Sequence, residues 1–281
     1  MRVAVVTDST AYLPAGVAAE RGIRVVPLEV RLGERVGREG IDVDAADLSA
    51  ALARQLDVQT SRPAPAEFAA CYREALDAGA DCVVSVHLSR ELSGTWDAAR
   101  LAAEEIGGDR VRVVDSRATA MGLGYAVLAA ADAADAGATG ADVEAAASDI
   151  VARCRMFFSV DNLDRLRRGG RIGAAAALVG TALAVKPLLH MEQGKIVPLE
   201  KVRTTARATQ RLVELAVKAA GNRPVDLAVH HLGAAARAED VAARLRERLP
   251  DITRLLVSEV GAVIGAHVGL GLLGVVVVPS P

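Results

Sequence analysis

Short runs of β-branched residues alternate with alanine-rich segments along the first half of the chain, and this pattern predicts strands that are each followed by a helix. Some runs, such as VVVV at 275–278, are apolar throughout, which is typical of strands in a parallel sheet covered on both faces. The predicted strands are 3–7, 24–30, 82–87, 111–114, 157–160, 227–231, 255–257 and 275–278. The predicted helices are 44–56, 65–78, 94–106, 124–136, 141–154, 205–220 and 236–248. The fold class that we expect is α/β, with right-handed crossovers.

The second half of the chain is less regular, and we expect it to form its own mixed α/β domain. Between 162 and 200 it carries a basic glycine-rich stretch, an apolar segment at 174–185, and a hairpin pattern in which Gly194 and Lys195 supply the turn. A boundary near Arg153 gives an N-terminal domain, 1–153, with a parallel sheet and flanking helices, and a C-terminal domain, 154–281. A length of 281 residues agrees with two domains of about 150 residues each.

Composition and charge exclude several classes of protein. With 52% hydrophobic and 24% charged residues, the chain is globular rather than disordered. The net charge is only -2 and aromatic residues make up 2%, so neither charge nor base stacking favours nucleic acid as a partner. The three cysteines, Cys71, Cys82 and Cys154, are an odd number without close pairing, which favours a reducing compartment. We therefore expect a cytoplasmic protein.

One stretch, 260–278, is uncharged and by hydropathy long enough to cross a bilayer. It is dense in glycine, and no Lys or Arg follows it as an anchor, so a loop followed by a buried strand is the better interpretation. We predict no membrane span, and we leave open a transient encounter with a membrane surface.

The sequence contains no known cofactor-binding motif in the structural context that such a motif requires. GLGLLG at 269–274 matches the dinucleotide fingerprint as a string, but a valine strand follows where the motif needs a helix. The five histidines are scattered apart from His230 and His231, and there is no HExxH motif or close cysteine pair. We predict no cofactor and no metal site.

Three polar segments lie where α/β proteins bind ligands, in loops after strands or before helices. They are TDST at 7–10, TSRP at 60–63 and LSGT at 92–95. Hydroxyl groups and free backbone N–H groups at helix starts suit an anion, although helix capping is the alternative for each segment. Three such segments in one half of the chain favour a shared anion site.

The second half adds three further candidates. His267 lies in GAVIGAHVGLG, which we predict to be a glycine-rich loop, and its ring can donate to a carboxylate or phosphate or serve as a core histidine. The basic run at 165–173 fits a solvated face, a phosphate-binding loop or a surface that docks a protein. The segment 174–185 predicts a buried helix of small residues that leaves room for a narrow apolar channel.

Taken together, these segments resemble the DegV family of fatty-acid-binding proteins. The resemblance runs in order over essentially the whole chain: TDST, TSRPAPAEF at 60–68, LSGTWDAA at 92–99, VDSRATAMGLG at 114–124, LRRGGRIG at 166–173, VKPLL at 185–189 and VIGAHVGLG at 263–271. It implies a two-domain protein that holds one long-chain fatty acid in a tunnel between the domains. It also implies a role in phospholipid synthesis, in which the carboxylate is presented to an ATP-dependent fatty acid kinase subunit.

The resemblance assigns roles to particular residues. It implies that Thr60, Ser61, Ser93 and Thr95 lie at the carboxylate, with His267 close by. Arg171 and Arg203 become candidates for the surface that faces the kinase. Arg62 stands where the family usually has Gln, and Leu270 stands where it usually has Pro.

The residues themselves make no complete catalyst, because Ser93 has no sequence-adjacent base and no nucleotide loop is visible. We therefore expect a non-catalytic carrier. The alternatives are a small-molecule hydrolase or transferase that uses Ser93 and His267, and an adaptor whose basic run binds nucleic acid.

Overall fold

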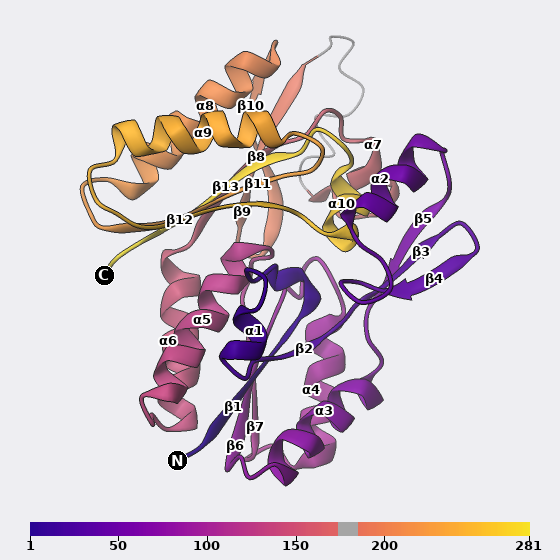
Figure 1. The fold of residues 1–281 in the computed structure, drawn as a ribbon, viewed down its shortest axis with the longest axis vertical. Coiled ribbons are helices and arrows are strands. Elements are labelled where there is room, and N and C mark those ends of the chain that lie inside the picture. The colour runs from indigo at the N-terminus through magenta and orange to yellow at the C-terminus, as the bar shows by residue number, and fades with distance from the viewer. Residues whose placement is uncertain (174–184) are drawn as a thin grey trace. The chain divides into compact units, whose positions relative to one another are not determined.

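The structure is a computed structural model that describes residues 1–173 and 185–281 (Figure 1). The chain divides into two compact units. The first unit comprises Met1–Arg31, Val36–Asp42 and Thr60–Ala152, and the second comprises Leu32–Arg35, Val43–Gln59 and Arg153–Pro281. The second unit thus takes in two short stretches that precede residue 60.

The first unit is built on a four-stranded parallel sheet with the order β2-β1-β6-β7. Its strands are β1 (Val3–Asp8), β2 (Arg24–Val26), β6 (Cys82–His87) and β7 (Val111–Asp115). Every residue of β6 is buried, as expected for a central strand with helices on both sides. The predicted parallel sheet with flanking helices is confirmed.

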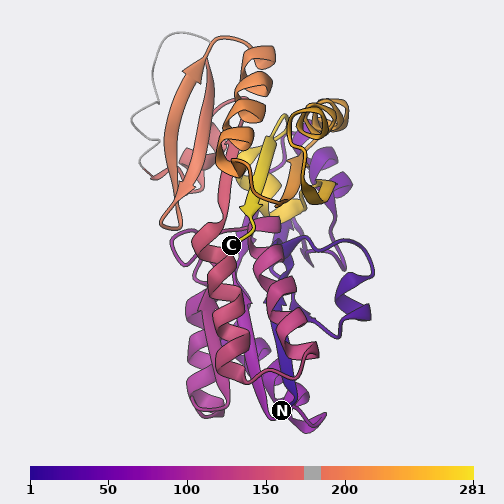
Figure 2. The ribbon, with the colours of Figure 1, turned by 90° about the vertical axis from the view of Figure 1, so that its left-hand side faces the viewer.

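Helices cover both faces of this sheet, with α3 and α4 on one side and α5 and α6 on the other (Figures 1 and 2). The helices of the first unit are η1 (Ser9–Ala11), α1 (Val17–Glu20), α3 (Pro65–Asp77), α4 (Thr95–Ile106), α5 (Met121–Asp135) and α6 (Gly140–Arg153). Pro65 opens α3 because its fixed φ suits the first helical position. Phe68 and Tyr72 of α3 are fully buried in the core that α3 and α4 form over the sheet.

Between β2 and α3 the chain forms elements that the sequence analysis resolved only in part. The strands β3 (Glu29–Leu32), β4 (Arg35–Arg38) and β5 (Val58–Ser61) make a three-stranded sheet in the order β4-β3-β5. The predicted strand 24–30 is therefore wrong as a single element, because it divides into β2 and β3. Helix α2 (Ala45–Ala53) begins at a capping box in which Asp44 and Asp47 accept from each other's backbone N–H.

The second unit carries a six-stranded sheet with the order β10-β9-β8-β13-β11-β12, in which only β11 and β12 pair in parallel. The strands are β8 (Arg155–Ser159), β9 (Lys186–Glu192), β10 (Lys195–Val202), β11 (Val225–His231), β12 (Ile252–Glu259) and β13 (Leu273–Pro279). The helices are α7 (Asp164–Arg168), α8 (Thr205–Ala220), α9 (Ala235–Arg248) and α10 (Ala262–Val268). Leu212, Leu227 and Leu245 are fully buried where α8 and α9 pack on the sheet. The predicted mixed α/β character is confirmed.

The predicted hairpin forms from β9 and β10, but its turn lies one residue earlier than expected. Glu192 pairs with Lys195, so the turn consists of Gln193 and Gly194. Both have positive φ, 49° and 81°, which a two-residue turn between twisted strands requires.

The segment 260–278 contains α10 and β13 rather than a loop and a strand. Nowhere in 1–173 or 185–281 is there a helix with the length and apolar character needed to cross a membrane. The small-residue helix predicted over 174–185 falls mainly on 174–184, which lie outside the described residues.

Candidate functional site

The polar segments of the first unit lie at the carboxyl ends of its strands. From β1 the chain runs to β2 on one side, and later returns to β6 on the other side of β1. The crevice between β1 and β6 is therefore the topological switch point, where open α/β sheets bind ligands. We call the segment 88–94, which leaves β6 here, the β6–α4 loop.

Ser89 fixes the course of the β6–α4 loop. Its backbone carbonyl accepts from Leu92 N at 3.0 Å and from Ser93 N at 3.1 Å, and its hydroxyl accepts from Glu91 N at 3.2 Å. Its own N–H donates to Ala118 O, at 2.8 Å, in the segment that follows β7. These bonds fold the loop into a compact turn that delivers Ser93 to the start of α4.

Ser93 and Thr95, two of the predicted ligand residues, lie within hydrogen-bond distance of each other. Their hydroxyl oxygens are 2.9 Å apart, and Thr95 N donates to Ser93 Oγ at 3.3 Å. Thr95 is fully buried, whereas Ser93 is half-buried. Thr95 is the first residue of the 12-residue helix α4 and Ser93 lies two residues before it, at the helix end where the backbone dipoles favour negative charge.

Thr60 and Ser61 are the last residues of strand β5, where the sequence analysis expected a loop. Thr60 is half-buried and Ser61 is exposed. The next residue, Arg62, lies across the β6–α4 loop, because a Cβ on Gly94 would be 2.1 Å from Arg62 Nη1. Nη1 also lies 3.5 Å from Gly94 O. The guanidinium thus meets the backbone between Ser93 and Thr95.

Two of the three hydroxyls of the TDST segment bond within the protein, whereas the buried Thr7 Oγ1 has no hydrogen-bond partner among the described residues. Ser9 Oγ donates to Glu39 at 2.6 Å, and Thr10 Oγ1 donates to Asp8 at 2.6 Å. The Asp8 carboxylate also accepts from the backbone N–H of Thr10 and of Leu88. The backbone N–H groups of Thr10 and Leu88 at the switch point are therefore already occupied by an internal carboxylate.

A buried hydrogen-bonded chain that was not predicted from the sequence joins Asp8 to His87, Ser85 and Tyr72. The available signal was the spacing of Ser85 and His87, because residues two apart on a strand share a face. What the sequence did not supply is that β1 lies next to β6 and brings Asp8 to that face.

In the second unit, His267 lies on α10 and not in the predicted loop. A Cβ on Gly169 would be 2.5 Å from His267 Nδ1, so glycine is needed for this close approach. Arg171 Nη1 donates to Gly169 O at 2.5 Å. Burial, and then the charge of Arg171, lower the pKa of His267 to about 4. The ring is neutral at pH 7 and offers one N–H donor and one acceptor.

The basic run of the second unit is not a uniform solvated face. Arg167 and Arg168 are exposed, whereas Arg165 and Arg171 are half-buried. The stem of Arg165 lies against Gly269, and burial lowers its pKa. Arg203 is exposed in the short connection between β10 and α8.

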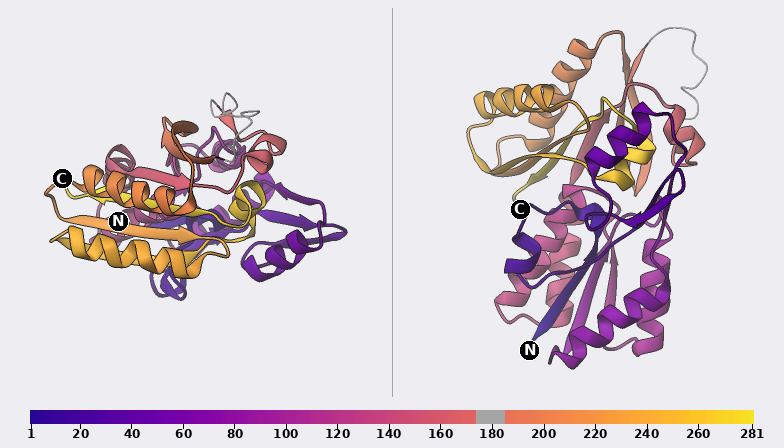
Figure 3. Two further views of the ribbon diagram at one scale, coloured as in Figure 1. Left: turned by 90° about the horizontal axis from the view of Figure 1, so that it is seen from above. Right: turned by 45° about the vertical axis from the view of Figure 1, so that its right-hand side comes forward.

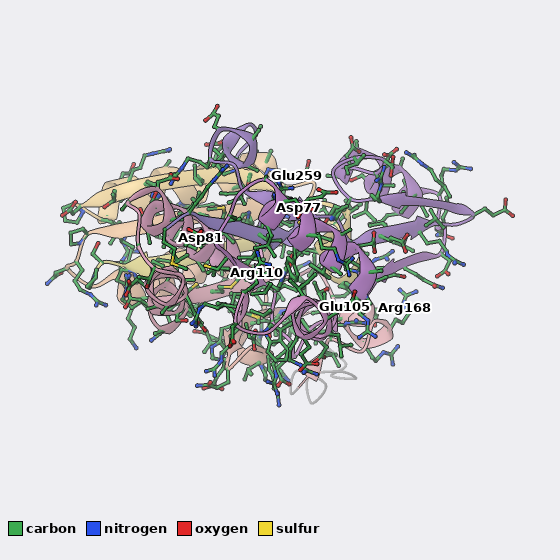
Figure 4. All side chains as sticks on the ribbon, turned by 90° about the horizontal axis from the view of Figure 1, so that it is seen from below. Asp77, Asp81, Glu105, Arg110, Arg168 and Glu259 are labelled. Carbon is green, nitrogen blue, oxygen red and sulfur yellow. The ribbon has the colours of Figure 1, made fainter. Side chains whose placement is uncertain are left out.

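The amino ends of the first unit's strands carry different chemistry. Asp81 precedes β6 and Arg110 precedes β7 at this end (Figure 4). A cavity of about 710 Å³ here is lined by residues that include Arg21 and Asp135, which bond to each other. Within the described ranges, no three His, Cys, Asp or Glu side chains gather as a metal ion would require.

The fold and the site define a class of α/β protein in which a parallel-sheet unit gathers polar loops at its carboxyl edge and a mixed-sheet unit carries a half-buried histidine, His267. A family model described as "Uncharacterised protein, DegV family" matches residues 2–280. The chain belongs to the DegV family, which confirms the resemblance seen in the sequence.

Relatives and solved structures agree with this assignment. A DegV domain-containing protein of Streptomyces coelicolor is 56% identical over 275 residues, which are 98% of each chain. A solved structure described as fatty acid binding of a DegV family protein from Thermus thermophilus is 35% identical, with a TM-score of 0.91 and coverage of 100% of both chains. The structure of DegV from Bacillus subtilis, described as a fatty acid binding protein, is 34% identical, with a TM-score of 0.90 and the same coverage.

Proposed function

We propose that this protein binds a long-chain fatty acid and acts as a non-catalytic carrier of it. The carboxylate is held by Thr60, Ser61, Ser93 and Thr95, with His267 as a further contact, and the acyl chain occupies a tunnel between the two domains. The observation that carries this proposal is the hydroxyl pair of Ser93 and Thr95 at the start of α4. The fatty acid binding stated for the Thermus and Bacillus structures supports it.

The chemistry of the site suits a carboxylate. A carboxylate removed from water needs donors, and hydroxyls, helix N–H groups and a neutral imidazole supply them without a metal. An acyl chain of about 14 methylenes gains roughly 11 kcal/mol on burial. Association and ordering subtract several kcal/mol, and the remainder still gives tight binding if the head group is paired.

The carrier would present its carboxylate to an ATP-dependent fatty acid kinase subunit, in a step that supplies acyl groups for phospholipid synthesis. Arg203, which is exposed, and Arg171, which is half-buried, are the proposed docking residues. The guanidinium groups offer planar donors to carboxylates on a partner.

Extraction of the purified protein tests the ligand directly. Protein from a bacterial host is denatured, extracted with organic solvent and examined by mass spectrometry, and we expect a fatty acid at near one equivalent. A protein that carries no acyl ligand and binds no added palmitate would refute the proposal. Labelling of Ser93 by an organophosphonate would instead support a hydrolase.

The variant Ser93→Ala is expected to weaken fatty acid binding by about 1–3 kcal/mol, because it removes a hydroxyl that pairs a desolvated carboxylate. Displacement of a fluorescent fatty acid measures the change. Ser148→Ala, on the exposed side of α6, is the matched control and should bind as the unaltered protein does. Equal affinity for both variants would remove Ser93 from the site.

Arg62→Gln is expected to lower fatty acid affinity by up to about fivefold, because an exposed charge contributes only about 0.2–1 kcal/mol. The loss should shrink as salt is raised and should be absent for the uncharged fatty alcohol of the same length. Arg73→Gln, which removes an exposed guanidinium from α3, is the control. An equal loss for acid and alcohol would show that Arg62 acts by packing and not by charge.

A further inference from the structure

Four side chains without exposed surface form a continuous hydrogen-bonded chain beneath the carboxyl ends of β1 and β6. They are Tyr72, Ser85, His87 and Asp8. Tyr72 OH donates to Ser85 Oγ at 2.9 Å, Ser85 Oγ lies 2.7 Å from His87 Nε2, and His87 Nδ1 lies 3.0 Å from Asp8 Oδ2. We call this set the Asp8 network.

The donors in the Asp8 network all point the same way. The Asp8 carboxylate accepts, so His87 Nδ1 donates to it, and in the neutral ring His87 Nε2 accepts from Ser85. Ser85 in turn accepts from Tyr72, and burial raises the pKa of Tyr72, which keeps the phenol protonated. The chain of donors therefore ends on Asp8.

Asp8 connects this chain to the loops above it. Its Oδ1 accepts from Thr10 N at 3.1 Å and Thr10 Oγ1 at 2.6 Å, and its Oδ2 accepts from Leu88 N at 3.0 Å. Leu88 is the first residue of the β6–α4 loop that carries Ser93. One carboxylate thus fixes the segments that leave both strands of the switch point.

The ring of His87 has a single orientation. Phe68 meets it edge-on, with ring centroids 5.0 Å apart, while both ring nitrogens are hydrogen-bonded. The Asp8 network accordingly has fixed ends, a fixed direction and no exposed surface on any of its four members.

A purely structural account of the network is weak. Replacing a buried polar network by apolar residues of similar volume is often neutral or stabilising, so such a network is weak evidence for a role in stability alone. The Asp8 network lies where the chain leaves β1 and β6, and Asp8 occupies the backbone N–H groups of Thr10 and Leu88, which an anion would otherwise bind. A ligand carboxylate is then directed to Ser93 and Thr95 at the start of α4.

We infer that Asp8 and His87 are positioning residues for the fatty acid head group, acting through Leu88 N on the β6–α4 loop. The inference rests on the proposed function of the same site. Asp8 and His87 do not touch the ligand, so their loss changes where Ser93 is held and not what it donates.

Two matched substitutions of His87 test the direction of the network. His87→Asn retains an amide N–H donor in the place of Nδ1 and can still serve Asp8, whereas His87→Gln places its amide where Nε2 lies and serves only Ser85, through the carbonyl oxygen as acceptor. We expect Asp8→Asn and His87→Gln to lower palmitate affinity at least tenfold, and His87→Asn and Tyr72→Phe to stay within about threefold.

Hydrogen exchange of the ligand-free proteins separates this inference from the proposed function. We expect faster exchange at 88–95 in Asp8→Asn and His87→Gln, and unchanged exchange there in Tyr72→Phe. Faster exchange in a protein that binds no fatty acid would overturn the proposed function and leave the positioning of the loop intact. Folded Asp8→Asn with unchanged affinity and unchanged exchange, or equal losses for both His87 variants, would overturn the inference.

Discussion

Replacing Phe68 by alanine is expected to lower the free energy of unfolding of the first unit by about 3–5 kcal/mol, the cost of truncating a fully buried aromatic ring. Phe68 has no exposed surface and lies in the core between α3, α4 and the sheet. Its ring also packs edge-on against His87 and 6.1 Å from the ring of Tyr72. The cavity would therefore open beside the buried polar chain as well as in the apolar core.

Urea denaturation followed by tryptophan fluorescence measures this effect selectively. Trp96, the chain's one tryptophan, lies on α4 in the first unit. Phe68→Leu is the matched control, because it retains most of the apolar volume and should cost less than about 1.5 kcal/mol. A loss below about 1 kcal/mol for Phe68→Ala, with an unchanged denaturant slope, would show that the site collapses around the missing ring.

The strands and helices that the sequence predicted well are those whose pattern is local. The apolar residues of the run VVVV and of the alanine-rich helices indicate burial without any long-range information, and the structure places each of these elements in a core. Strands β3 and β4 carry Arg and Glu at exposed positions and β5 carries Gln and Ser there, so no apolar run reveals them.

The glycines around His267 were interpreted as a loop because glycine lowers helix propensity. In α10 the reason for Gly265 is packing, since a Cβ there would be 2.3 Å from Leu48 and 2.9 Å from Leu232. Leu48 belongs to α2, which lies beside α10 (Figure 3). These helices are over 200 residues apart in the chain, and a local pattern cannot express that contact.

The candidate site divides in the same way. Ser93 and Thr95 were accessible to sequence reasoning because the chemistry and the helix start lie within four residues. Asp8 and His87 were not, because 79 residues separate them and each looks like an ordinary strand end. The adjacency of β1 and β6 decides what they do.

Acidification is expected to destabilise the second unit between pH 6.5 and about 4 through the buried His230 and the half-buried His267. Burial lowers the pKa of His230 to about 4, and burial followed by the charge of Arg171 lowers the pKa of His267 to about 4. In the unfolded chain both titrate near 6.5, so the unfolded state binds more protons within this window. The free energy of unfolding is highest above pH 6.5 and falls with pH, by an amount on the order of 3 kcal/mol for each histidine.

Substitution of each histidine isolates its share. His230→Asn and His267→Asn should each flatten the pH dependence of the free energy of unfolding between pH 6.5 and 5. The ion-paired Glu200 and Glu214 contribute only below this window, because Arg211 lowers the pKa of both carboxyls. Asn is chosen because its amide takes the place of Nδ1. In His230 this atom faces Ser258, and in His267 it faces Gly169. A slope that neither variant changes would assign the acid sensitivity to other groups.

Proton uptake on fatty acid binding tests the proposed ligand contact of His267. A carboxylate placed beside this ring would oppose the effects of burial and of Arg171 and raise the pKa of His267 from about 4. Fatty acid binding at pH 6 should then take up protons, measured by calorimetry in two buffers of different ionisation enthalpy. His267→Asn should take up fewer protons than the unaltered protein, and His230→Asn should take up the same number. Equal uptake by all three proteins would place the carboxylate away from His267 while leaving its contact with Ser93 to be judged by the Ser93→Ala affinity.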